Sequence, residues 1–338
     1  MKILITGGTG YIGSHTCCEL LKNNYEVVII DNLINSKKDV ISKIEKITDK
    51  NVTFYKGDVS DKQILTTIFK KEKIDAVIHF AGLKAVGESV KKPLTYYRNN
   101  IDSTLTLLEV MNEFNCKNII FSSSATVYGN QDTPKCVETM SLQTPTNPYG
   151  KTKSMIENIL QDLYISDNSW KITILRYFNP VGAHESGLLG EDPNGIPNNL
   201  MPYILKVAIK ELPILTIFGS DYETKDGTCV RDYIHVVDLA SGHLKALEHS
   251  FNNEPNVYTY NLGTGCGVSV KEIVDTFEKV NNVKLNYQYG KRREGDLPQI
   301  YADATKAYKE LGWKTSKNLE DMCKDSYNFA IQTLKNKK

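Results

Sequence analysis

The chain has 338 residues, of which 41% are hydrophobic, so it can bury one large core or two smaller ones. Its 41 basic and 40 acidic side chains give a net charge of +1, which argues against binding nucleic acid or a membrane surface through a strong overall field. Seven scattered cysteines without a C-x-x-C pair predict reduced thiols in a cytoplasmic protein. The six histidines have no H-x-x-x-H or H-E-x-x-H spacing, so we expect no bound metal.

The N-terminal segment has the pattern strand, glycine turn, helix. Residues 6–13 read TGGTGYIG, in which Gly7, Gly10 and Gly13 let backbone amides approach a pyrophosphate at the helix N-terminus. The next predicted strand ends in Asp31, whose carboxylate suits a ribose 2′-hydroxyl and repels a 2′-phosphate. This pattern predicts NAD as the cofactor, although the nearby lysines at 37 and 38 leave NADP as an alternative.

The alternation of short apolar runs with helical patterns continues along the chain. Strands are predicted at residues 52–55, 76–80 and 118–122, with helices starting at Asp61 and covering residues 99–115. Such repeats predict the fold class α/β, with a doubly wound parallel sheet of the Rossmann type and a second, smaller α/β domain.

The domain boundary is expected near residue 180. Residues 1–180 are predicted to form the dinucleotide-binding domain and residues 181–338 the substrate domain. The segment 234–262 has a helix and a strand pattern that can return to the first domain or to the cleft.

Two groups of residues directly follow predicted strands. Asp58 and the run from Phe80 to Lys84 stand where a doubly wound sheet presents its adenine and nicotinamide contacts. Asp58 is equally well explained as a capping residue, and Lys84 as an ordinary solvated lysine. Ser124 follows the strand 118–122 and can hydrogen-bond a sugar hydroxyl from the same sheet edge.

Tyr149 and Lys153 stand four residues apart in a predicted helix, so their side chains share one face. Asn147 is a plausible N-cap and Pro148 stands near the first helical position, which places Tyr149 in the first turn. The lysine charge and the positive helix end are expected to favour the phenolate, which needs a shift of about 3 units from a reference pKa of about 10. Taken alone, the pair is more often a chance pattern on a surface helix.

Together these motifs resemble the extended short-chain dehydrogenase/reductase superfamily, and most closely its UDP-glucose 4-epimerase family. The resemblance spans almost the whole chain and rests on the segments TGGTGYIGSH, DNLINS, HFAGLKAVGES, SSSATVYG, PYGKTK, RYFNPVGAH, GIPNNLMPY, RDYIHVVDLA and REGDLP. It implies interconversion of UDP-galactose and UDP-glucose through a 4-keto sugar, with NAD recycled in the site. It also implies a homodimer formed through helices near residues 99–115 and 149–164.

The resemblance implies a role for many individual residues. Tyr149 is the expected catalytic base, Lys153 holds the nicotinamide ribose and tunes Tyr149, and Ser124 orients the sugar. The residues expected to bind the cofactor, here the cofactor set, are Gly7, Gly10, Tyr11, Ile12, Gly13, Asp31, Asn32, Asn35, Ser36, Asp58, Val59, Phe80, Ala81, Gly82, Lys84, Asn99, Ser122, Tyr149, Lys153, Tyr177, Phe178 and Pro180. Those expected to bind the UDP-hexose, here the substrate set, are Lys84, Ser124, Tyr149, Phe178, Asn179, Asn199, Leu200, Phe218, Arg231, Tyr233, Arg293, Asp296 and Ile300.

Two positions bear on rival functions. The 4,6-dehydratases of the superfamily carry Thr-Asp-Glu where this chain has Ser124, Ala125 and Thr126, so dehydration is disfavoured. Two further rival functions are a ketoreductase that consumes NAD(P)H and a non-catalytic dinucleotide sensor. Ile300 stands where strict glucose-type bacterial enzymes carry tyrosine, and our hypothesis is that the smaller side chain admits an N-acetyl group at C2.

Overall fold

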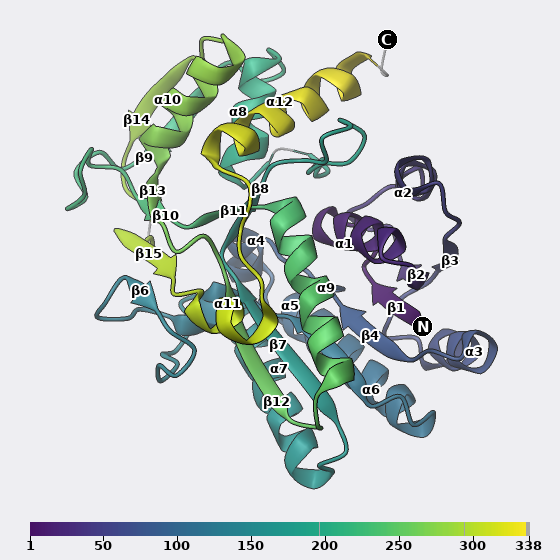
Figure 1. Cartoon of the computed structure of the whole chain (residues 1–338). Helices are drawn as coiled ribbons and strands as arrows, with labels where there is room; N and C mark the ends of the chain where they lie inside the picture. The colour runs from purple at the N-terminus through teal and green to yellow at the C-terminus, as the bar shows by residue number, and fades with distance from the viewer. Residues whose placement is uncertain (196, 294, 336–338) are drawn as a thin grey trace.

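A computed structural model describes residues 1–195, 197–293 and 295–335 of the chain. Its centre is a seven-stranded sheet in the order β12-β7-β5-β4-β1-β2-β3, in which all neighbours run parallel (Figure 1). The strands are β1 (Lys2–Thr6), β2 (Glu26–Asp31), β3 (Thr53–Lys56), β4 (Ala76–His79), β5 (Asn118–Ser122), β7 (Lys171–Tyr177) and β12 (Val257–Leu262).

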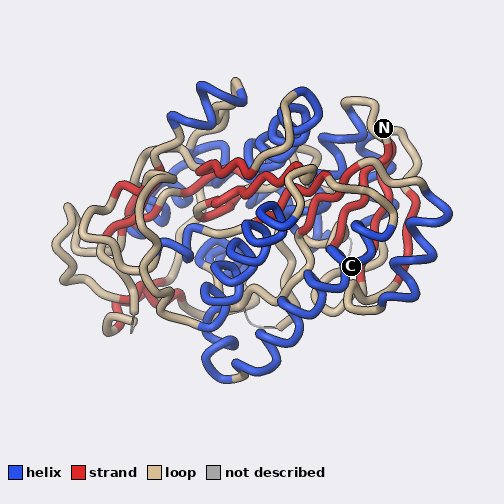
Figure 2. The backbone as a smooth tube through the Cα atoms, turned by 90° about the horizontal axis from the view of Figure 1, so that it is seen from below, coloured by secondary structure: helices blue, strands red, loops and turns tan. Residues whose placement is uncertain are grey.

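Both faces of this sheet are buried, because successive residues of a strand point to opposite sides. Ile3 and Ile5 of β1 belong to one apolar cluster, whereas Leu4 between them belongs to the other. The first cluster includes side chains of α1 (Tyr11–Lys22), α2 (Val40–Thr48) and α9 (Val236–Asn252), and the second those of α3 (Lys62–Glu72), α6 (Ser103–Glu113) and α7 (Pro148–Ser166). Figure 2 shows the resulting layer of strands between helices.

A separate apolar cluster holds the C-terminal elements together at one end of the molecule (Figure 1). It contains side chains of α8 (Leu200–Ala208), β9 (Leu215–Phe218), α10 (Val270–Asn281) and α12 (Leu319–Lys335). The remaining strands are β6 (Lys135–Cys136), β8 (Asn179–Val181), β10 (Val230–Arg231), β11 (Tyr233–His235), β13 (Val268–Ser269), β14 (Tyr287–Gly290) and β15 (Gln299–Ala302). The short helices are α4 (Val86–Lys91), α5 (Pro93–Tyr97), the 3-10 turn η2 (Ala125–Tyr128) and α11 (Thr305–Leu311).

The predicted fold class is confirmed, while the position of the domain boundary stays a prediction. The segment 234–262 supplies α9, which packs against α1, and β12, which is the edge strand beside β7. None of the helices in the described part of the chain has the length and apolar character needed to cross a bilayer.

The helix predicted over residues 99–115 differs from the one observed. The chain first forms a π-helical turn, η1 (Arg98–Asp102), and α6 begins only at Ser103. Asn100 lies in this turn, buried from solvent, and its amide hydrogen-bonds both backbone groups of Leu83, at 2.8 and 3.0 Å. A wide turn of this kind is often found at functional sites, and here it fixes the loop that follows β4.

Candidate active site

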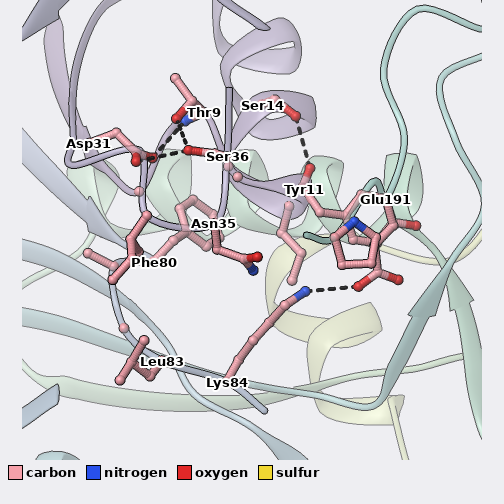
Figure 3. A pocket seen from close by; sticks show the side chains of 18 of the residues that line it. Thr9, Tyr11, Ser14, Asp31, Asn35, Ser36, Phe80, Leu83, Lys84 and Glu191 are labelled. Atoms are coloured by element: carbon pink, nitrogen blue, oxygen red, sulfur yellow. Dashed lines mark hydrogen bonds and ion pairs between the residues drawn. The ribbon is translucent and has the colours of Figure 1, made fainter. Parts of the chain in front are cut away.

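A cavity of about 800 Å³ lies at the carboxyl ends of β1, β2, β3 and β4, where a doubly wound sheet binds its ligands (Figure 3). The structure brings most of the predicted cofactor set to its wall. The predicted residues that line it are Gly7, Gly10, Tyr11, Ile12, Gly13, Asp31, Asn32, Asn35, Ser36, Asp58, Val59, Phe80, Ala81, Gly82, Lys84, Asn99, Tyr149, Lys153, Tyr177 and Asn199.

The glycine turn between β1 and α1 is too tight for larger residues. Gly7 has φ +71°, and a Cβ atom on Gly13 would lie 2.4 Å from the Gly7 carbonyl oxygen. The turn is closed by a hydrogen bond from the Gly10 amide to that same oxygen at 3.1 Å. The N-terminus of α1 therefore approaches the cavity closely, which suits a phosphate group.

Asp31 is held in one orientation at the end of β2. Its carboxylate accepts hydrogen bonds from the Thr9 amide at 3.2 Å, the Leu33 amide at 2.8 Å and the Ser36 hydroxyl at 3.0 Å (Figure 3). Lys37, which left NADP open as an alternative, forms an ion pair with Asp192 from the opposite wall. A phosphate near Asp31 would therefore meet a buried carboxylate and a lysine that is already paired.

The residues that follow β3 and β4 are also fixed by local contacts. Asp58 accepts hydrogen bonds from the Ser60 amide at 2.9 Å and from the Asn32 side chain at 2.8 Å, so it shapes its loop while it lines the cavity. Lys84 reaches across the cavity and forms an ion pair with Glu191 at 2.9 Å (Figure 3). Its ammonium group also lies 5.8 Å from the centre of the Tyr11 ring.

Helix α7 begins as the sequence predicts. The Asn147 side chain caps it by accepting a hydrogen bond from the Gly150 amide at 2.9 Å, with Pro148 in the first turn. Tyr149 is 5% exposed and its hydroxyl hydrogen-bonds the side chains of Ser124 and Tyr177. The Tyr149 hydroxyl of α7 therefore contacts a hydroxyl from the loop after β5 and one from the end of β7, beside the cavity.

Lys153 is 6% exposed and donates a hydrogen bond to the Ser122 carbonyl oxygen at 2.8 Å, with its ammonium group 4.7 Å from the Phe121 ring centre. Burial lowers the pKa of Lys153 to about 8, although the Glu157 charge opposes this shift. Glu157 is the next residue on the same helix face and forms a buried ion pair with Arg176 at 2.7 Å.

The prediction that the surroundings of Tyr149 lower its pKa and so favour the phenolate is wrong for the groups that this chain itself supplies. Burial raises the pKa of Tyr149 well above its ordinary value, and Tyr177 adds to this increase. Ser124, through its hydrogen bond, and the positive charge of Lys84 act in the opposite direction. The sequence could not show this balance, because it depends on how deeply α7 is buried and on which lysine faces the phenol.

Part of the predicted substrate set, namely Phe218, Arg231, Arg293, Asp296 and Ile300, forms a second group around β10 and β15. Asp296 lies 3.5 Å from the guanidinium groups of both Arg231 and Arg293, and Arg293 lies 4.9 Å from the Phe218 ring centre. Ile300 pairs with Arg231 across the two strands. Among the described residues that line the cavity, none belongs to this group.

The other predicted residues lie outside this second group. Ser122 and Phe178 are buried, while Asn179 is exposed and its strand β8 pairs with Tyr233 and its neighbours in β11. Pro180 also lies in β8, and Leu200 is the first residue of α8. Asn199 donates a hydrogen bond to Glu191 at 3.0 Å and lines the cavity.

The comparisons with known proteins agree with this geometry. The family model described as GDP-mannose 4,6 dehydratase matches residues 4–326. A UDP-glucose 4-epimerase of Bacillus subtilis (strain 168) is 55% identical over 329 residues, which cover 97% of this chain and 96% of the relative. The chain belongs to the UDP-glucose 4-epimerase family.

Solved structures of this family superimpose closely on the chain. The UDP-glucose 4-epimerase from Bifidobacterium longum, in complex with NAD+ and UDP, has a TM-score of 0.96 and 51% identity over 99% of both chains. The UDP-Glc/GlcNAc 4-epimerase from Campylobacter jejuni has a TM-score of 0.85 and 39% identity, covering 98% of this chain and 99% of its own.

The sequence reading missed two residues that organise the site, Asn100 and Glu191. Asn100 lies inside a predicted helix, where nothing in the local pattern indicates a wide turn. Glu191 contacts Lys84, which is 107 positions away in the sequence, so only the folded chain brings the two together. The run of glycine and acidic residues at 190–192 marks a loop and nothing more specific.

Proposed function

We propose that this chain interconverts UDP-galactose and UDP-glucose by epimerisation at C4, with NAD held in the site as a recycled cofactor. The observation that carries the proposal is the meeting of the Ser124, Tyr149 and Tyr177 hydroxyl groups beside a cavity at the sheet edge. Membership of the UDP-glucose 4-epimerase family supports the same reaction.

The residues around the cavity fit a dinucleotide. A pyrophosphate suits the amides of the glycine turn, where a Cβ on Gly13 would fill the space, and a ribose diol suits the oriented carboxylate of Asp31. NAD, when bound, supplies the group that accepts hydrogen from C4 of the sugar and returns it. Lys153 is placed to hold the nicotinamide ribose, because its ammonium group points from α7 toward the end of β5.

Tyr149 is the proposed proton acceptor for the 4-hydroxyl group. Burial keeps its pKa high, so the charge of Lys84 and the hydrogen bond with Ser124 must act together to stabilise its anion. Ser124 orients the sugar hydroxyl, and Tyr149 returns the proton after the 4-keto sugar has turned its other face to the cofactor. No acid comparable to the dehydratase pair follows Ser124, since Ala125 and Thr126 occupy those positions.

The cluster of Arg231, Arg293 and Asp296 is the proposed anchor for the UDP group. Guanidinium groups bind phosphate oxygens through paired, charge-assisted hydrogen bonds, which a chain of net charge +1 must provide locally. An anchor of this kind leaves the hexose free to rotate about its diphosphate link while the nucleotide stays bound.

We also propose that the enzyme is a cytoplasmic homodimer. Helices α5, α6 and α7 carry the exposed apolar side chains Leu94, Leu105 and Met155, which are 82%, 40% and 45% exposed. A second copy of the chain would cover these side chains in a helix-to-helix interface. Sedimentation analysis should give twice the mass of one chain, and a monomer at micromolar concentration would contradict the proposal.

A second activity, on N-acetylated UDP-hexoses, is supported by Ile300 and by the likeness to the Campylobacter jejuni enzyme. Ile300 packs against the small apolar cluster that contains Phe178 and Tyr128, next to the arginine cluster. We expect measurable conversion of UDP-GalNAc, and we expect Ile300→Tyr to reduce it much more than it reduces conversion of UDP-galactose. Equal losses on both substrates would contradict a role for this position in selecting the acetyl group.

The proposed function is tested by identifying the product formed from UDP-galactose. An epimerase gives UDP-glucose at equilibrium, a dehydratase gives a 4-keto-6-deoxy sugar, a ketoreductase consumes added NAD(P)H, and a sensor gives no product. Nuclear magnetic resonance distinguishes these outcomes in one reaction mixture. Formation of any product other than UDP-glucose, or of none, would refute the proposal.

A further inference from the structure

One wall of the cavity is formed by residues 187–194, here called the strap, which follow β8. Its base is fixed because Leu189 is 2% exposed in the main apolar cluster and its carbonyl accepts a hydrogen bond from the His184 amide at 2.9 Å. Gly190 packs so closely on Phe329 of α12 that a Cβ there would lie 2.5 Å from the ring. The strap therefore extends along the cavity wall from a firmly packed base.

Three contacts join the strap to loops of the opposite wall. Glu191 pairs with Lys84 after β4, and Asp192 pairs with Lys37 after β2. The Asn194 side chain donates a hydrogen bond to the Ile34 carbonyl oxygen at 3.3 Å. Two adjacent acids thus contact two lysines from different loops.

The two ion pairs differ in burial and in what surrounds them. The Glu191 side chain is 10% exposed, although that of its partner Lys84 is 43% exposed, and Glu191 accepts a second hydrogen bond from Asn199 at 3.0 Å. The Asp192 and Lys37 side chains are 35% and 52% exposed, which makes theirs a surface pair that contributes little. Figure 3 shows Lys84 extending from the loop below the cavity to the Glu191 carboxylate.

We propose that Glu191 is a positioning residue for the epimerisation, because one carboxylate holds both the Lys84 ammonium group and the Asn199 amide in place. This inference rests on the proposed function, in which Lys84 acts on Tyr149, and on the prediction that Asn199 belongs to the substrate set. In this proposal Glu191 itself contacts neither C4 of the sugar nor the group of the cofactor that accepts its hydrogen. Its task is to keep a cofactor-side residue and a substrate-side residue at a fixed separation.

The electrostatics around Glu191 agree with this role. Although burial lowers the pKa of Lys84, the Glu191 charge and hydrogen bond outweigh it and raise the pKa, so the lysine stays charged. The charge of Lys84 in turn stabilises the anion of Tyr149. The Lys84 side chain is 43% exposed, so removal of Glu191 would leave its ammonium group free to turn toward solvent and away from Tyr149.

The test compares Glu191→Ala, Glu191→Gln and the matched control Asp192→Asn, all as full-length proteins with unchanged circular dichroism spectra and melting temperatures. UDP affinity is measured by calorimetry and bound NAD is measured after gel filtration. We expect Glu191→Ala to weaken UDP binding about tenfold and Glu191→Gln to weaken it less, because its amide oxygen still accepts a hydrogen bond. Asp192→Asn should change UDP binding by less than about twofold.

Equal losses of UDP affinity in Glu191→Ala and Asp192→Asn would overturn the proposal. They would show that either ion pair of the strap matters equally, and that Glu191 has no special role. Unchanged UDP affinity in Glu191→Ala would also overturn it. Neither readout requires turnover. An inactive wild-type protein would therefore refute the proposed function, while the comparison between the variants would still report on Glu191.

Discussion

The cofactor set and the arginine cluster of the substrate set are built in different ways. Asp31 is 8% exposed with three hydrogen-bond donors around its carboxylate, whereas the Arg293 side chain is 58% exposed and contacts mainly Asp296 and Phe218. The first arrangement is rigid before any ligand binds, and the second must adjust when one arrives. This difference suits a cofactor that stays and a sugar nucleotide that exchanges.

We expect the largest effect on activity from a substitution of Tyr149, at the junction between these two regions. Tyr149→Phe removes the proposed proton acceptor without changing the ring, so we expect kcat to fall by about a thousandfold, within the range for loss of general base catalysis. The amount of NAD that the protein retains, measured by absorbance, should stay near its wild-type value. The affinity for UDP, measured by calorimetry, should also stay near its wild-type value. A variant that turns over as fast as the wild type would remove Tyr149 from the mechanism.

The rigidity of the cofactor side is tested by Gly13→Ala. A new Cβ 2.4 Å from the Gly7 carbonyl oxygen forces α1 away from the turn, at a cost of about 1–3 kcal/mol in the free energy of unfolding. We expect a lower melting temperature and loss of the NAD that copurifies with the protein. Gly87→Ala in α4 is the control, because a Cβ there meets nothing within 4 Å. Similar losses in both variants would contradict a special role for the glycine turn.

The substrate side should respond differently, and Arg293→Ala tests this. We expect the KM for UDP-galactose to rise about tenfold, as for the loss of one charge-assisted contact, while retained NAD is unchanged. Arg292→Ala is the matched control, since that neighbouring side chain pairs with Asp221 and lies 4.3 Å from the Tyr222 ring centre. If Arg293→Ala released NAD, the two regions would not be independent.

The smallest effect is expected from pH. Because burial lowers the pKa of Lys153 to about 8, we expect kcat/KM to fall to about half near pH 8 and further above it. This decline in kcat/KM does not result from unfolding of the protein at high pH. An unfolded lysine keeps its proton up to about pH 10.4, so between the two pKa values the unfolded state binds more protons and this group makes the fold more stable as pH rises. A constant rate up to about pH 10 would contradict the assignment.

The sequence predicts the parallel sheet well because each strand and helix carries its own periodicity. The glycine turn, Asp31 and the Asn147 cap were also predictable, since each depends on neighbours a few residues away. The chemistry of Tyr149 was not, because burial by the whole fold decides its pKa. Glu191 was missed for a related reason, since its partner Lys84 comes from a loop that only the folded chain brings close.

The most direct test of the account uses UDP-galactose that carries deuterium at C4, with the purified protein and no added dinucleotide. Retained NAD would move the C4 hydrogen away and return it to the same carbon from the other face. We therefore predict UDP-glucose that keeps its deuterium, with no net accumulation of reduced cofactor. Loss of the label to water, or no conversion unless NAD(P)H is supplied, would contradict a recycled cofactor at this site.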